Sequence, residues 1–244
     1  MFGHHDDTNY GIGWEGDEGR SDVKSVCGDY PAVISFDLGH IELGDTMSLD
    51  KVPFTKIRKE ILNQYKRGGM SSLSWHLRNP LTGGDSWDVS DTTVVKSILP
   101  GGANHEKFTG WVSKVSAFIN SLQTEEGVKV PVLFRPWHEH TGSWFWWGEK
   151  LCTPEEYKAL WHMTVDILRN DGVDNALYAY SPGSEPQDTA QYLKRYPGDE
   201  LIDLIGFDTY QFERDTYLAN LEKSLAIVDL SLIHISEPTR LALI

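Results

Sequence analysis

One segment of the sequence combines a carboxyl group with many aromatic side chains. It reads FRPWHEHTGSWFWWG over residues 134–148 and places Glu139 between His138 and His140. A carboxyl group among aromatic rings is partly desolvated, which favours its protonated form and suits a general acid that protonates a leaving oxygen. Glu139 could instead form a structural ion pair with Arg135. We favour the general acid.

The histidines around Glu139 also raise the question of a metal site. His138 and His140 are two residues apart, whereas the helical zinc motif separates its histidines by four. On a strand, this spacing points both side chains to the same face. The run HHDD at residues 4–7 is a weak metal pattern that an ordinary loop explains better. We expect neither a metal nor a cofactor.

The aromatic residues 144–147 follow Gly142-Ser143 and precede Gly148-Glu149. Glycine and polar residues on both sides indicate an exposed loop, where large flat rings are costly unless they contact a ligand. Aromatic rings suit the flat apolar faces of sugars. The alternative is a hydrophobic wedge beneath the loop. We expect a sugar-binding platform that includes Trp144 and Trp147.

Elements of two kinds must position these residues. Short apolar runs at 31–38, 70–76, 130–139, 175–181 and 201–210 predict buried strands. Helical periodicity is found at 54–66, 105–122, 154–169, 187–196 and 215–228, and the TPEE run at 153–156 is a helix start signal. Residues 11–21 and 81–90 read as loops. The alternation predicts an α/β fold with a parallel sheet.

Polar or aromatic residues recur where the predicted strands end. They are Asp37, His76, His138 with Glu139, Ser181, and Asp208 with Tyr210. The strand ends of a (β/α)8 barrel converge on one face, and those of a doubly wound sheet converge too. We favour the barrel because no glycine-rich phosphate loop follows the first strands. Considered separately, His76 could be a histidine buried in the core. Tyr210 could be a strand-end residue whose hydroxyl forms a local hydrogen bond.

Composition narrows the class of partner. The 244 residues carry a formal charge of −14, which argues against nucleic acid and anionic lipid surfaces as partners. No apolar run approaches the roughly 18 residues of a membrane span, and no secretion signal is evident. Two cysteines, Cys27 and Cys152, leave open whether they pair. We expect one domain and a neutral ligand.

Taken together, these segments resemble glycoside hydrolase family 26, whose best-known members are endo-β-1,4-mannanases. The resemblance is carried by GHHDD (3–7), SDV (21–23), GDYPAV (28–33), DLGHIE (37–42), SWHLRNP (74–80), residues 135–148 and GFDTYQ (206–211). It implies a (β/α)8 barrel and retaining hydrolysis by two glutamates, at the ends of strands four and seven. Glu139 matches the acid/base. The substrate-binding candidates are His76, Arg135, His138, Trp144, Trp147, Asp208 and Tyr210.

The chain departs from the family pattern near its end. A family member would continue into a seventh strand that ends in the nucleophile, whereas residues 230–240 read LSLIHISEPTR, which resembles a translated sequencing adapter. We therefore expect a partial catalytic barrel at 1–229 and a non-native read-through tail at 230–244. Glu237 precedes a proline with no apolar strand before it, so we reject it as the nucleophile.

The fold expected from the sequence is thus an incomplete barrel without strands seven and eight and with most of strand one missing. The activity expected is retaining hydrolysis of internal β-1,4 bonds in mannan, glucomannan or galactomannan, with the 244-residue chain alone inactive. Alternatives are a β-1,3-xylanase or mixed-linkage glucanase of the same family, or a non-catalytic carbohydrate-binding protein. We further expect a monomer that is secreted, periplasmic or at the cell surface.

Overall fold

The computed structural model describes residues 2–210 and 214–232. Its main feature is a six-stranded parallel sheet. The strands are β1 (Gly3–His5), β4 (Val33–Asp37), β5 (Met70–Ser74), β6 (Val132–Arg135), β7 (Ala176–Tyr180) and β8 (Leu204–Ile205). Neighbours in the sheet follow chain order, β1-β4-β5-β6-β7-β8, and every pair is parallel. A doubly wound sheet would reverse its order at a switch point, so the order observed is that of a barrel.

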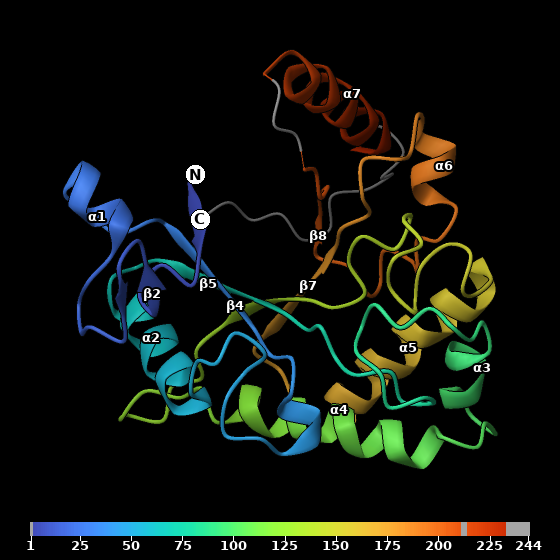
Figure 1. Cartoon of the computed structure of the whole chain (residues 1–244), viewed down its shortest axis with the longest axis horizontal. Helices are drawn as coiled ribbons and strands as arrows, with labels where there is room; N and C mark the ends of the chain where they lie inside the picture. The colour runs from blue at the N-terminus through green and yellow to red at the C-terminus, as the bar shows by residue number, and fades with distance from the viewer. Residues whose placement is uncertain (1, 211–213, 233–244) are drawn as a thin grey trace.

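Helices connect the strands (Figure 1). The five predicted helices are present as α2 (Phe54–Lys66), α4 (His105–Asn120), α5 (Pro154–Asn170), α6 (Thr189–Leu193) and α7 (Arg214–Leu232). Helix α5 starts as expected, because Thr153 accepts a hydrogen bond from the Glu156 amide while the Glu156 carboxylate accepts one from the Thr153 amide. Helices α2, α4 and α5 lie along the same side of the sheet.

Several short elements lie where no element was predicted. They are α1 (Asp22–Cys27), α3 (Val94–Ile98), the 3-10 turn η1 (Ile41–Leu43), and a hairpin of β2 (Tyr10–Gly11) and β3 (Trp14–Glu15). Helix α1 starts at the Ser21 cap and ends at Gly28, whose φ of 85° a glycine adopts without strain. At six residues, with none buried, it has no apolar stripe for a sequence pattern to reveal.

Two strand predictions needed correction. No strand was predicted before residue 31, whereas Gly3–His5 pairs with β4. The run at 201–210 was expected to form a long strand, but only Leu204–Ile205 pairs with β7, and the following residues extend toward the site. Of the tail predicted at 230–244, including Glu237, residues 233–244 lie outside the described part.

The core lies between the sheet and the helices. The strands contribute Ile34, Phe36 and Leu73, all fully buried, which is why these runs read as continuously apolar. The rings of Trp75 and Trp137 pack with centroids 5.8 Å apart. Both cysteines are free, with Cys27 exposed and Cys152 buried. None of the described helices is both long and apolar enough to cross a membrane.

Candidate active site

Glu139 lies in a tight turn that follows β6. The strand ends at Arg135, and both Trp137 (φ 55°) and Glu139 (φ 54°) adopt the left-handed backbone conformation. This conformation is uncommon for residues with large side chains, and strain of this kind concentrates at functional sites. The Glu139 amide donates to the Ser181 carbonyl at 2.8 Å, which ties the turn to the end of β7. Sequence reasoning had extended the strand through Glu139.

The Glu139 side chain is buried, at 6% exposure, and has one tryptophan as a hydrogen-bond donor. Trp144 Nε1 donates to Glu139 Oε2 at 2.8 Å. An indole nitrogen can only donate, and the unprotonated oxygen of a carboxyl group is its stronger acceptor. The contact therefore favours Oε1 as the oxygen that carries a proton on Glu139. Such a carboxyl group can present its proton in one fixed direction.

Of the four aromatic residues in the loop, only Trp144 is substantially exposed, at 39%. The prediction of an exposed platform is wrong for Phe145, Trp146 and Trp147, which are buried. The loop folds back on itself, with the Glu149 amide donating to the Gly142 carbonyl, and this turns the three rings inward. The Trp147 ring stacks on Phe145 and its Nε1 donates to the His138 carbonyl at 2.9 Å. Trp147 thus supports the backbone of the site through a buried contact.

His76 and His138 join a buried carboxylate in a chain of hydrogen bonds. His76 Nδ1 lies 2.6 Å from Asp37 Oδ2, and His76 Nε2 lies 3.0 Å from His138 Nε2. Burial alone would raise the pKa of Asp37, but hydrogen bonds from His76, Ser74 and the Gly39 amide outweigh it and hold the pKa well below its usual range. The pKa of His138 is lowered by burial and by the charges of Arg135 and His76. His138 is therefore neutral at neutral pH.

A second aromatic residue beside the site was missed by sequence reasoning. Trp87 is 52% exposed, and its ring stacks on that of His76 with centroids 5.5 Å apart and an interplanar angle of 8°. It also packs against Phe145 at 5.3 Å. The only signal for it was a lone tryptophan within the polar loop 81–90. Trp87 and Trp144 are the exposed indoles next to Phe145.

The remaining predicted residues form a polar group at the ends of β6, β7 and β8. Arg135 Nη1 donates to Asp208 Oδ2 at 2.6 Å, and the Ser181 hydroxyl donates to the same oxygen at 2.6 Å. The ion pair of Arg135 is therefore with Asp208 and not with Glu139, which removes the structural alternative for Glu139. Burial raises the pKa of Asp208, although Arg135 and Ser181 oppose it.

Tyr210 is exposed over most of its surface, but the charge of Glu139 affects the pKa of its hydroxyl. Partial burial, followed by the negative charge of Glu139, raises the pKa of Tyr210 to about 12. The structure thus brings together Glu139, Trp144, His76, His138, Arg135, Asp208 and Tyr210 at the carboxyl ends of the parallel strands.

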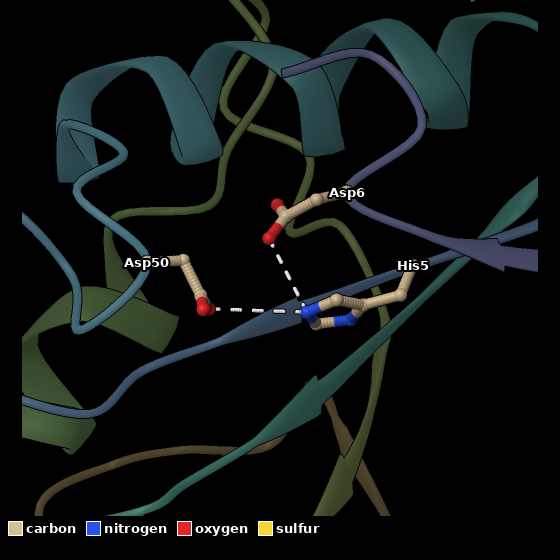
Figure 2. A group of neighbouring side chains, drawn as sticks. All are labelled: His5, Asp6 and Asp50. Carbon is tan, nitrogen blue, oxygen red and sulfur yellow. Dashed lines mark ion pairs between the residues drawn. The ribbon is translucent and has the colours of Figure 1, made fainter. Parts of the chain in front are cut away.

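A possible cation-binding group lies at the end of β1 (Figure 2). His5, Asp6 and Asp50 place one ligand atom each within 4.8 Å of one another, a grouping of at least three such residues that is unique within the described part of the chain. His5 Nε2 lies 3.2 Å from Asp6 Oδ2 and 3.8 Å from Asp50 Oδ2. Burial would lower the pKa of His5, but Asp50 and Asp6 raise it. An imidazole paired with two carboxylates accounts for the arrangement, and its raised pKa favours the charged form.

Comparison with known proteins gives the same family as the motifs. The family model for glycosyl hydrolase family 26 matches residues 1–232. The structure of a GH26 β-mannanase from Bacteroides ovatus is 63% identical, with a TM-score of 0.93, and the match covers 95% of this chain and 67% of that one. An endo-β-1,4-mannanase from Cellulomonas fimi is 34% identical, with a TM-score of 0.86, and the match covers 96% of this chain and 53% of that one.

Curated relatives include mannan endo-1,4-β-mannosidases from Bifidobacterium adolescentis and Bacillus subtilis. They are 38% and 27% identical over 86% and 81% of this chain. The matched residues span 21% and 55% of the lengths of these two relatives. With its sequential parallel strands and the motif-bearing turn around Glu139, the chain belongs to glycoside hydrolase family 26.

Proposed function

We propose that the protein is a retaining endo-β-1,4-mannanase that hydrolyses internal bonds of mannan, glucomannan or galactomannan, with Glu139 as acid/base. One observation carries the proposal. Glu139 is buried in a strained turn at the carboxyl end of a parallel strand, with one oxygen fixed by Trp144 and the other able to carry a proton. The names of the relatives support mannan as the substrate.

In the proposed reaction, Glu139 first protonates the leaving glycosidic oxygen from Oε1. It then removes a proton from the water that releases the sugar from the enzyme. Retention of configuration requires a second carboxylate about 5–5.5 Å away as nucleophile. We assign no residue of this chain to that role. Asp208, a carboxylate whose pKa is raised in part by the charge of Glu139, is engaged by Arg135 and Ser181.

The surroundings of Glu139 fit a neutral sugar polymer. Trp144 and Trp87 offer exposed flat rings, while His76, Arg135, Asp208 and Tyr210 offer hydrogen-bonding groups. The formal charge of −14 favours an uncharged ligand over a polyanion. A polysaccharide does not cross membranes, so we further propose that the protein acts outside the cytoplasm. We also propose that it acts as a monomer.

The test uses the full-length protein and a panel of galactomannan, glucomannan, β-1,3-xylan and mixed-linkage glucan. We expect the viscosity of galactomannan to fall well before reducing ends accumulate, because internal bonds are cut first. Activity confined to xylan or mixed-linkage glucan would replace the substrate assignment. Binding of mannan without hydrolysis would instead identify a carbohydrate-binding protein.

A further inference from the structure

Arg195, just after α6, is a buried charged residue whose contacts the proposed reaction leaves unexplained. It is 2% exposed, and its guanidinium faces the loop that follows Glu139. Nη1 donates to the carbonyls of His140 at 2.7 Å and Trp147 at 3.3 Å. Nη2 donates to the carbonyls of Gly148 at 3.4 Å and Cys152 at 2.8 Å, and contacts Cys152 Sγ at 2.8 Å. All these acceptors belong to one loop.

A buried guanidinium is costly unless charged or polar partners compensate it. None of the ion pairs found between described residues involves Arg195. Compensation comes from the carbonyl dipoles of the loop and from the Tyr157 ring, which the guanidinium covers at 4.4 Å. The carbonyls can compensate this charge only while the loop keeps its present conformation.

The same contacts reach both sides of Glu139. Arg195 holds the carbonyl of His140, immediately after Glu139. Tyr157, which stacks under Arg195, donates its hydroxyl to the Trp137 carbonyl at 2.7 Å. Trp137 and Glu139 have the two left-handed φ values of this turn, so the strained backbone is held from its two ends.

We propose that Arg195 is a positioning residue for the acid/base: by holding the carbonyls of residues 140–152, it fixes the Glu139 carboxyl and the Trp144 donor. The proposal rests on the proposed function. A planar guanidinium with several fixed donors can contact these separate carbonyls at once. A lysine ammonium is a single point charge and cannot reproduce the set.

The test compares two substrates of the full-length protein. Galactomannan needs a proton on its leaving oxygen, whereas the 2,4-dinitrophenolate of a 2,4-dinitrophenyl β-mannobioside leaves with little protonation. The variants are Arg195→Lys and Arg195→Met. Arg169→Lys is the control, because Arg169 is exposed and its one side-chain hydrogen bond within the described part of the chain is from Nη2 to the Glu200 carbonyl. Melting temperature and circular dichroism report on folding.

We expect Arg195→Lys to lower kcat/KM on galactomannan by about tenfold or more, part of the effect of a general acid. On the activated substrate, kcat/KM should fall by less than about threefold, since the first step there hardly uses the acid. Arg169→Lys should match the wild type on both substrates. A general loss of structure would lower both values alike.

Equal losses on the two substrates, an unchanged Arg195→Lys, or failure of both variants to fold would overturn the positioning role while leaving the proposed function in place. A wild-type protein that hydrolyses neither substrate would instead overturn the proposed function, and the role of Arg195 with it.

Discussion

Trp144 combines an exposed ring with a hydrogen bond to Glu139. Its Nε1 donates a hydrogen bond to Oε2 of the carboxyl group, and the residue remains 39% exposed. The donor and the ring are separable by substitution, because phenylalanine keeps an aromatic ring without the N–H. The contribution of the hydrogen bond to catalysis can therefore be measured apart from that of stacking.

We predict that Trp144→Phe lowers kcat on galactomannan by about tenfold to a hundredfold, the size expected for losing a hydrogen bond to a charged group, about 1.5–3 kcal/mol. KM should change less, because the ring remains. Steady-state kinetics check this, with Trp111→Phe on α4 as the control. A loss confined to KM would show that Trp144 acts only by stacking.

Most of the residues of the candidate site could be predicted from the sequence, but their backbone geometry could not. Glu139 was found because its neighbours are chemically distinctive. Its φ of 54° could not be predicted, because a left-handed backbone at a glutamate is stabilised only by tertiary contacts, such as the hydrogen bond from its amide to the Ser181 carbonyl. Trp147 was misplaced for a related reason: tryptophans suit cores and sugar sites equally, and the fold of the loop decides between them.

The loop after β6, at residues 136–152, is held by elements far away in the sequence. Its His140 ring is buried between Tyr157 of α5 and Tyr180 of β7, with centroid distances of 4.4 and 4.9 Å. Neither ring nitrogen has a hydrogen-bond partner among the described residues. Burial, and then the charge of Arg195, lower the pKa of His140 well below its usual value.

The lowered pKa of His140 predicts acid sensitivity. Below about pH 6.5 the unfolded chain binds a proton at this histidine that the folded chain does not, so stability falls as the pH falls. Each such group costs up to about 1.4 kcal/mol per pH unit in this range. We predict that His140→Phe loses less stability than the wild type between pH 7.5 and 5.5. Urea unfolding at both pH values checks this, and equal losses would contradict it.

The long helices were predictable from their period, whereas the short helices α1 and α3 were not. Helices α2, α4 and α5 have 13, 16 and 17 residues, enough for a repeated apolar face. Helices α1 and α3 have six and five, too few for a repeat. Strand β8 has two residues, fewer than the predicted run, because apolar content alone does not show where a strand stops pairing.

At the scale of the whole molecule, the sheet order explains how residues 171 positions apart come to lie at the same face. Asp37 follows β4 and Asp208 follows β8, yet parallel strands in chain order bring all their carboxyl ends to one face. The alternation of strands and helices predicted this convergence, and the family resemblance predicted the barrel. Arg195 escaped notice because nothing in its local sequence distinguishes a buried arginine from a surface one.

The central claim is that Glu139 is the acid/base of a retaining glycosidase, and Glu139→Ala tests it most directly. In the full-length protein, with exposed Glu106→Ala as control, we predict a fall of about 10²- to 10⁴-fold in kcat on galactomannan. Added azide should restore turnover of a 2,4-dinitrophenyl β-mannobioside and yield the β-configured glycosyl azide, because azide needs no base. Undiminished hydrolysis of galactomannan, or an α-configured azide, would contradict the claim.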